Sequence, residues 1–504
     1  MVRQWSPALT AALLLGVVGC VQTIKRAEVV KIDGSVGKAD FQPPNTVHPN
    51  PLTTLASEPL PAPPELTGPQ PVDVFIRRAL AENRTVQAAY HNVQSLRQRI
   101  PQVTTLDDPV ASNSIFPIPA VAPQYSLMGY NPYNLTIAQQ FPWFGTLRLR
   151  GEATEKDVQV ALAELAAAQL DTVAAVKRAY YNLYAGLKVD EILKENRKIL
   201  VDFQANARER LATGGNQQDV IRAGTLISEL DRSVAENIQA VASARSALAR
   251  QIHVSPEASF TTLPELSFEA VPIEFERLYQ LAILARPELK GRLAAVARDE
   301  KAVELAAKRF YPNITLGMTY MDMEKTNAQT PRTASGVPNI GFFVAFNLPV
   351  YKAKYKAGVC EAEQRALADA KLFEAQRDET SSEIQDFMIQ VKTQQSVLSL
   401  LRDSIQPRAK EVFNLAESDY AKGNVNYATM QSALREVLQV QIQVTQVQAE
   451  LGKAIASLER AVGCEINEHP PAPTADATGV IPTPATHRPA STASPFKPAI
   501  PLPH

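Results

Sequence analysis

The chain contains the stretch QQFPWFG at residues 139–145 and a related stretch, FNLPVY, at residues 346–351. Each follows a run in which apolar and polar side chains alternate, and each precedes a long segment with helical periodicity. A proline between two such patterns marks the point where a strand ends and a helix begins. We therefore predict two strand-to-helix junctions, at Pro142, Trp143 and Gly145 in the first copy and at Pro349 in the second.

Other landmarks return at nearly the same spacing, about 207 to 211 residues by direct count along the sequence. Ala207 and Gly214 return as Ala416 and Gly423, in the same order relative to the junctions. The chain is therefore a duplication of one unit, which reads as helix, strand pair, long helix, tight turn and long helix. Such a unit is too long for a solenoid repeat and indicates a large pseudo-symmetric domain.

The amino terminus carries the pattern of a secretory signal. Arg3 supplies a positive charge, residues 9–18 are apolar, and this run ends at Cys20. A cleavage site that ends in cysteine is typical of bacterial lipoproteins, so we predict that Cys20 carries a lipid, whose burial contributes about 0.8 kcal/mol per CH₂. An ordinary signal peptide with a chance cysteine is the alternative. Val21, next to the lipidated residue, resembles lipoproteins sent to the outer membrane.

Two proline-rich segments lie outside the repeats and read as an extended tether and a disordered tail. Proline also marks a crossover linker between the copies. The expected division of the chain is a signal peptide at 1–19, a lipidated tether at 20–71, a first repeat at 72–254, a linker at 255–272, a second repeat at 273–463 and a tail at 464–504.

The helical segments are unusually long. Residues 146–211 contain no proline, and a continuous helix of that length spans on the order of 100 Å. The returning arms carry apolar residues at steps of three or four, so these helices need neighbours along their whole length. Many charged and amide side chains separate the apolar ones, and we expect neither arm to cross a bilayer as a helix. On periodicity alone, a long solvated coiled-coil hairpin is the alternative.

The first helix of the first copy differs from its counterpart. About 17 positions separate Arg84 from Pro101, whereas about 25 separate Pro287 from Pro312. If each proline ends its helix, the first helix is about two turns shorter.

The strand patterns have the length and alternation of transmembrane strands. Residues 339–348 alternate strictly between an apolar, aromatic face and a face of smaller or more polar residues. Residues 313–323 and 134–141 alternate in a similar way. A further strand is expected within residues 109–116, where prolines interrupt the pattern. About ten residues suffice for a tilted strand to cross a membrane. Four strands cannot close a barrel, and open sheet edges in hydrocarbon cost several kcal/mol per unpaired backbone group, so a homo-oligomeric barrel is predicted.

The lipoprotein cysteine, the two copies, the paired junction stretches and a glycine turn in each helical hairpin resemble the TolC-like outer-membrane efflux protein family. The resemblance covers roughly residues 72–463. It implies a mostly α protein with a transmembrane β-barrel contribution, in which three protomers, each with four strands and long periplasmic α-helical hairpins, form one α/β-barrel. The aromatic version of the first junction is similar to members that serve heavy-metal efflux pumps.

The resemblance also implies a function, which is passive conduction from an inner-membrane pump and a periplasmic adaptor to the exterior. The hairpin tips, at residues 208–219 and 418–430, are then the docking or gating points, where glycine releases the backbone for a turn. The alternative is that these are solvated turn residues only. The positions expected to contact the adaptor or to gate the channel are Arg210, Gly214, Gly215, Asp219, Asp419, Tyr420, Lys422 and Gly423.

Other protein classes fit the sequence less well. Outside the tails only His91 and His253 are histidines, and no phosphate loop, paired-carboxylate motif or metal-ligand spacing stands out, so no enzyme, cofactor or metal site is predicted. The 51 basic and 52 acidic residues argue against nucleic acid as a partner. A periplasmic adaptor or a structural coiled-coil lipoprotein is the remaining alternative, but an adaptor has one helical hairpin between β-rich halves, and this chain has two hairpins.

Overall fold

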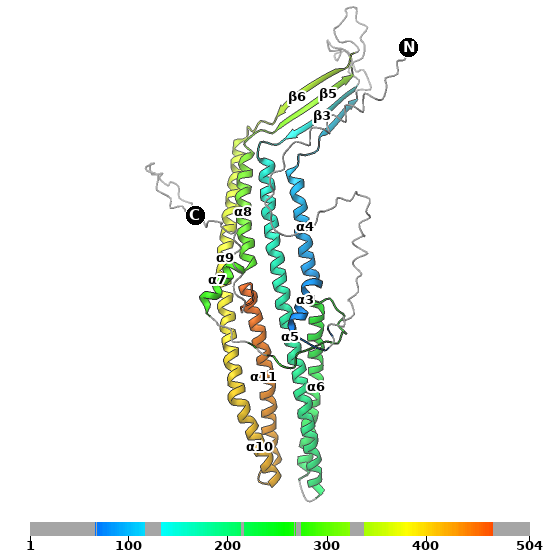
Figure 1. Ribbon diagram of the computed structural model, residues 1–504, viewed down its shortest axis with the longest axis vertical. Coiled ribbons are helices and arrows are strands. Elements are labelled where there is room, and N and C mark those ends of the chain that lie inside the picture. Colours follow the sequence, from blue (N-terminus) through cyan, green and yellow to red (C-terminus); the bar gives the residue numbers. More distant parts are fainter. Residues whose placement is uncertain are drawn as a thin grey trace, which may run out of the picture. The chain divides into compact units, whose positions relative to one another are not determined.

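The computed structural model describes residues 66, 68–115, 133–212, 216–266, 268, 274–322 and 337–466, all within one compact unit, Pro59–His504. Cys20, Gly214, Gly215 and the proline-rich tail beyond residue 466 lie outside the described residues. The elements in chain order are β1 (Pro69–Gln70), α3 (Val72–Glu82), α4 (Arg84–Thr104), β2 (Val110–Ile115), β3 (Tyr133–Phe141), α5 (Thr146–Ala212), α6 (Gln217–Gln251), β4 (Thr261–Thr262), α7 (Phe275–Ala285), α8 (Pro287–Lys308), β5 (Ile314–Asp322), β6 (Asn339–Phe346), α9 (Lys352–Leu400), a π-helix (Leu401–Ile405), α10 (Gln406–Lys422) and α11 (Tyr427–Val462) (Figure 1).

The duplicated order of elements is confirmed. A short helix, a longer helix, two strands, a very long helix and a returning helix occur in each half, and α3 and α7 both have 11 residues. The first copy has one uninterrupted helix of 67 residues, α5. The second copy divides the matching segment into α9, the π-helix and α10. A π turn accommodates extra chain without ending the helix, which keeps the two halves in step.

The expectation of a shorter first helix is wrong. The helix α4 has 21 residues and α8 has 22, because α4 continues through Pro101 to Thr104. A proline one turn before a helix end removes a single hydrogen-bond donor, so the helix can proceed past it. The backbone N–H of Thr105 then donates to Pro101 O at 3.2 Å, where the helix ends.

The four long strands form one antiparallel sheet in the order β2, β3, β5, β6. The central pairing of β3 with β5 joins the two copies, and Thr136 and Thr319 meet there with their hydroxyls 3.2 Å apart. On β6, the large apolar side chains of one face, Ile340, Phe342, Val344 and Phe346, are 55% to 83% exposed. Strands β2 and β6 form the edges, so each has one side without a partner within the sheet.

Equivalent hydrophobic cores stabilise the two copies. In the first, Phe75 of α3 packs on Tyr180 of α5 beside Leu248 of α6. In the second, Leu278 of α7 packs with Ile384 of α9 and with residues of α11. Each short helix therefore packs against both the long helix that follows the strands and the helix that returns.

Structured residues occur inside both the expected tether, residues 20–71, and the expected linker, residues 255–272. Leu66 is buried in the first core, and β1 pairs in parallel with β4 of the linker. The Tyr180 hydroxyl donates to Gln70 O at 2.9 Å and accepts from the Leu263 N–H at 3.0 Å, so it fixes both segments to α5.

One helix among the described residues, α5, is long and apolar enough by composition to cross a membrane. The expectation that neither arm reaches that apolarity is therefore wrong for α5 on composition. Alanine is the cause, because α5 contains runs such as residues 166–168 that raise its hydropathy without bulky side chains. The helix packs against α3, α4, α6, α8 and α11, which is the environment of a bundle helix.

Candidate functional site

The two hairpin tips pack into one hydrophobic cluster. Leu200 and Phe203 of α5 and Leu226 of α6 lie with Met430 and Leu434 of α11. The rings of Phe203 and Phe413 meet edge to face with centroids 6.4 Å apart. Because both copies contribute, the tips predicted separately from the sequence form a single structural unit within one chain.

Arg210 connects the first tip to the second. Its guanidinium donates to the backbone oxygens of Tyr420 at 3.0 Å and Ala421 at 3.1 Å. It also lies over the Tyr420 ring, 4.5 Å from the centroid. The Tyr420 carbonyl also accepts from the Gly423 N–H at 3.1 Å, so the guanidinium adds to the cap of α10. A cation at this position opposes the negative end of the helix dipole.

Two tyrosines extend this contact into the tip. The rings of Tyr420 and Tyr427 meet edge to face at 5.7 Å, and Tyr427 is buried. Burial raises the pKa of Tyr420, and the carboxylate of Asp219 raises it further, while Arg210 lowers it. Burial, with Tyr420 and Asp219, raises the pKa of Tyr427 to about 12. Both phenols are therefore neutral at physiological pH.

The tip turns are built from caps that the sequence analysis missed. Asn216 accepts from the Gln218 N–H at 3.0 Å at the start of α6, and Asn426 accepts from the Thr429 N–H at 2.9 Å at the start of α11. Gly423 ends α10 with φ +78°, and the Asn424 N–H donates to Asp419 O at 2.9 Å. The two asparagines recur at the spacing of the other landmarks, which is the signal that could have identified them.

The structure therefore joins some of the predicted tip residues and leaves others apart. Arg210 and Tyr420 touch, and Asp219, in the first turn of α6, acts on the tyrosines through its charge. Lys422 is exposed in the last turn of α10. An open pocket of about 480 Å³ lies beside the contact, lined by Phe203, Asn206, Glu209, Arg210, Glu417, Tyr420 and Ala421.

The predicted strand-to-helix junctions precede α5 and α9, at the ends of the long helices away from the hairpin tips. Between β3 and α5, the Thr146 N–H donates to Trp143 O at 3.0 Å, and Gly145 has φ +82°. The Trp143 N–H donates to Asn313 Oδ1 at 3.3 Å, so the first junction is fixed to the start of β5 in the second copy. Pro349 lies in the turn between β6 and α9.

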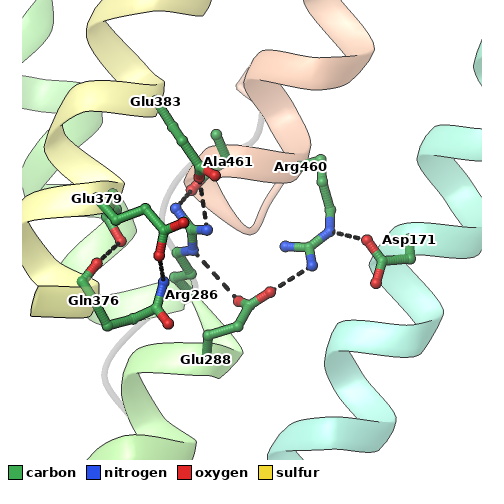
Figure 2. A network of polar contacts seen from close by, with 9 residues as sticks. Asp171, Arg286, Glu288, Gln376, Glu379, Glu383, Arg460 and Ala461 are labelled. Atoms are coloured by element: carbon green, nitrogen blue, oxygen red, sulfur yellow. Dashed lines mark hydrogen bonds and ion pairs between the residues drawn. The ribbon is translucent and has the colours of Figure 1, made fainter. Parts of the chain in front are cut away.

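A partly buried ionic network holds the end of α11 against three other helices (Figure 2). Arg286 pairs with Glu383 of α9 at 2.7 Å and donates to Ala461 O of α11 at 3.3 Å. Arg460 of α11 pairs with Asp171 of α5 at 2.5 Å and with Glu288 of α8. The network therefore ties the two copies together where α11 ends and α8 begins.

The ion pair between Arg460 and Glu288 stabilises the charged form of both groups. Burial opposes the charge of Arg460, but hydrogen bonds to Asp171 and Glu288 more than compensate and raise its pKa. Burial also opposes the charge of Glu288, while Arg460 outweighs that effect and lowers the pKa of the carboxyl. The pair is thus ionised at neutral pH and acts as a structural clamp.

One protein family and several solved structures are similar to this chain. Residues 278–464 match the family described as outer membrane efflux protein. The outer-membrane channel OprN is similar in structure, with a TM-score of 0.66 and 20% identity over 78% of this chain and 90% of that one. CusC gives 0.65 and 17% identity over 81% and 97%, and the open state of the MtrE outer membrane channel of Neisseria gonorrhoeae gives 0.63 and 18% over 78% and 89%. Curated proteins give no match.

Proposed function

We propose that this chain, a member of the TolC-like outer-membrane efflux protein family, is the outer-membrane channel component of a tripartite efflux system. It conducts passively, while an inner-membrane pump supplies the energy and a periplasmic adaptor connects the two. The single observation that carries the proposal is the four-stranded sheet with two open edges, joined to helices of up to 67 residues. A tube that crosses the membrane as strands and the periplasm as helices needs both parts.

The assembly we propose is a homotrimer. Edge strands β2 and β6 leave backbone donors and acceptors unpaired, which hydrocarbon does not tolerate, so β6 of one copy pairs with β2 of the next. The exposed faces of the long helices pack side by side in the same assembly. A lipid on Cys20 anchors each protomer to the periplasmic face of the outer membrane, and the sheet contacts outer-membrane lipid directly.

The tips are the proposed gate and adaptor-docking point. The Arg210 contact with Tyr420 and Ala421 holds the first hairpin to the second through two hydrogen bonds and one cation–π contact. Each contributes little at a partly exposed site, so adaptor binding can exchange them for new contacts at small cost.

Planar-bilayer recording of the detergent-extracted, lipidated full-length protein tests the proposal. Discrete conductance steps are expected, with steps of the same size in repeated insertions. A protein that inserts as judged by protease protection yet never conducts, while a reference channel conducts in the same bilayers, contradicts the proposal.

A further inference from the structure

Three chain segments meet where the strands join the helices, and we call them the collar: residues 142–150, 308–313 and 347–356. The Trp143 ring stacks on Tyr311 with centroids 5.1 Å apart. The Phe310 ring meets Tyr355 at 5.7 Å, which brings the start of α9 to the end of α8. Lys308 Nζ lies 5.8 Å from the centroid of Tyr311. The three segments therefore form one surface of interleaved aromatic and basic side chains.

The collar is strongly positive. It contains no acidic residue, and its basic residues are Arg148, Arg150, Lys308, Arg309, Lys352, Lys354 and Lys356. Arg148 pairs with Glu152 at 3.4 Å, and among the ion pairs of the described residues none involves the other six. Asp107 and Asp108 follow α4 near this level, where Asp107 O accepts from Gln139, but these two carboxylates do not balance the six remaining cations.

Helix stability accounts for only some of these charges. Lys308 and Arg309 lie at the C-terminal end of α8, where the helix dipole favours cations, but the charges at the starts of α5 and α9 have no such support. The first turns of α5 and α9 contain no acidic residue, and lysines at the start of α9 face the positive end of its dipole. Large apolar side chains nevertheless accompany them on the surface: Phe144, Leu348 and Tyr351 are each about three-quarters exposed. Exposed aromatic groups beside unpaired cations match a boundary between hydrocarbon and anionic headgroups.

We propose that the collar binds the anionic phosphate headgroups of phospholipids such as phosphatidylglycerol in the periplasmic leaflet. The sheet ends at Phe141, Ile314 and Phe346, so each collar segment begins directly beside a strand end and continues into the first turns of α5 and α9 or the last turn of α8. The aromatic rings lie at the level of the headgroups, and the lysines and arginines contact the phosphates. The inference rests on the outer-membrane placement proposed above, which conductance tests separately.

Trp143 makes the inference directly measurable. The chain has two tryptophans, and the other one, Trp5, lies in the expected signal peptide. In mature full-length protein reconstituted in phosphatidylcholine vesicles, the fluorescence of Trp143 reports lipids at the collar. Lipids brominated on the acyl chain quench it on contact, so brominated phosphatidylglycerol and brominated phosphatidylcholine can be compared at equal mole fraction.

The expected result is preferential quenching by phosphatidylglycerol that weakens as salt is raised. The triple variant Lys352→Gln/Lys354→Gln/Lys356→Gln loses that preference by on the order of tenfold to a hundredfold, and the matched Lys→Arg triple retains it. The control Lys371→Gln/Lys392→Gln/Lys410→Gln removes the same charge from exposed positions further along the helix and leaves the preference unchanged.

Several outcomes overturn the inference. Equal quenching by both lipids, an unchanged preference in the Lys→Gln triple, or an equal loss in the control shows that the collar does not select anionic lipid. Competition by inorganic phosphate as effective as that of the lipid points to a soluble anion instead. If the Lys→Gln triple dissociates the oligomer while lipid preference is absent, the collar packs against another copy. A variant that still conducts in any of these cases leaves the channel proposal intact.

Discussion

At the scale of single residues, the tip depends on a few positions whose geometry admits little substitution. Gly423 has φ +78°, a conformation that costs other residues about 1–2 kcal/mol. Arg210 satisfies two carbonyls at the end of α10, a helix from the other copy. Tyr427, the first residue of α11, is buried in the hydrophobic cluster of the hairpin tips. These residues connect the local turn chemistry to the proposed gate.

Gly423→Ala is expected to lower the free energy of unfolding of the tip by about 1 kcal/mol, because alanine disfavours positive φ. Gly358, inside α9, has ordinary helical φ and open space around it, so Gly358→Ala is expected to stabilise by roughly 0.5–1 kcal/mol. Hydrogen exchange of the α10 and α11 amides measures the first change, and thermal unfolding in detergent measures the second. Equal effects of the two variants contradict the turn geometry described here.

Arg210→Met is expected to raise the conductance of the resting channel, because it removes the contacts that hold the two hairpins together. Arg208→Met is the control, since Arg208 is exposed on the same turn. Single-channel recording distinguishes the two. Unchanged conductance in Arg210→Met, with the protein still inserted, excludes this contact from the gate.

At the scale of elements, the strands and long helices follow from local patterns, whereas their partners do not. Alternation predicted β5 and β6 to within two residues at each end, and the stretch after Phe141 predicted the start of α5. The β3–β5 pairing and the network around Arg286 join residues far apart in the chain, so no local pattern reports them. The end of the first helix was not predicted, because a proline within the last turn removes a single hydrogen-bond donor and α4 continues through Pro101 to Thr104. Arg210 and Tyr420 were singled out from turn position alone, and their contact became visible only in three dimensions.

The pairing of Gly317 with Phe343 makes a specific demand on the sheet. A Cβ at Gly317 would overlap the Phe343 ring across the strands, whereas Gly341 has open space. Gly317→Ala is expected to destabilise the sheet by about 1–3 kcal/mol through displacement of the ring. Gly341→Ala is expected to change stability by a few tenths of that amount. Heat-modifiable mobility on a gel reports both, and an equally stable Gly317→Ala protein contradicts the register of β5 and β6.

The ionic network around Arg286 and Glu288 leads to two predictions about stability, one for a substitution and one for its dependence on pH. Arg286→Met leaves the partly exposed Glu383 without its partner, while Glu288 keeps Arg460. The variant is expected to cost about 2 kcal/mol, less than the roughly 3–5 kcal/mol of a fully buried pair, because Glu383 is partly exposed. Arg365→Met, which removes only an exposed pair with Glu361, is expected to be nearly neutral. Thermal unfolding at neutral pH compares them.

The pH dependence follows from the lowered pKa of Glu288. A carboxyl with a lowered folded-state pKa stabilises the protein above its unfolded pKa of about 4.3, and the contribution is lost as pH falls through the folded value. Thermal stability should therefore fall below about pH 4, and Glu288→Gln should flatten that fall. An unchanged acid limb in Glu288→Gln removes this group from the account.

At the scale of the whole molecule, two features favour the proposed assembly of several copies. Four strands leave two edges, and α5 leaves most of its apolar window uncovered, with 28% buried. The proposed closed barrel accounts for both, because in it neighbouring copies would pair the edge strands and cover the helices. The tether and the predicted lipid on Cys20 add an anchor but do not replace this closure.

The central claim is that several copies complete one barrel, and the mass of the detergent-extracted, full-length assembly tests it most directly. Native mass spectrometry is expected to show three chains, and Val344→Pro on the edge strand β6 is expected to reduce that species, since proline removes a ladder donor. A wild-type protein that is folded by circular dichroism and remains a monomer, in a detergent that preserves a reference trimer, contradicts the claim.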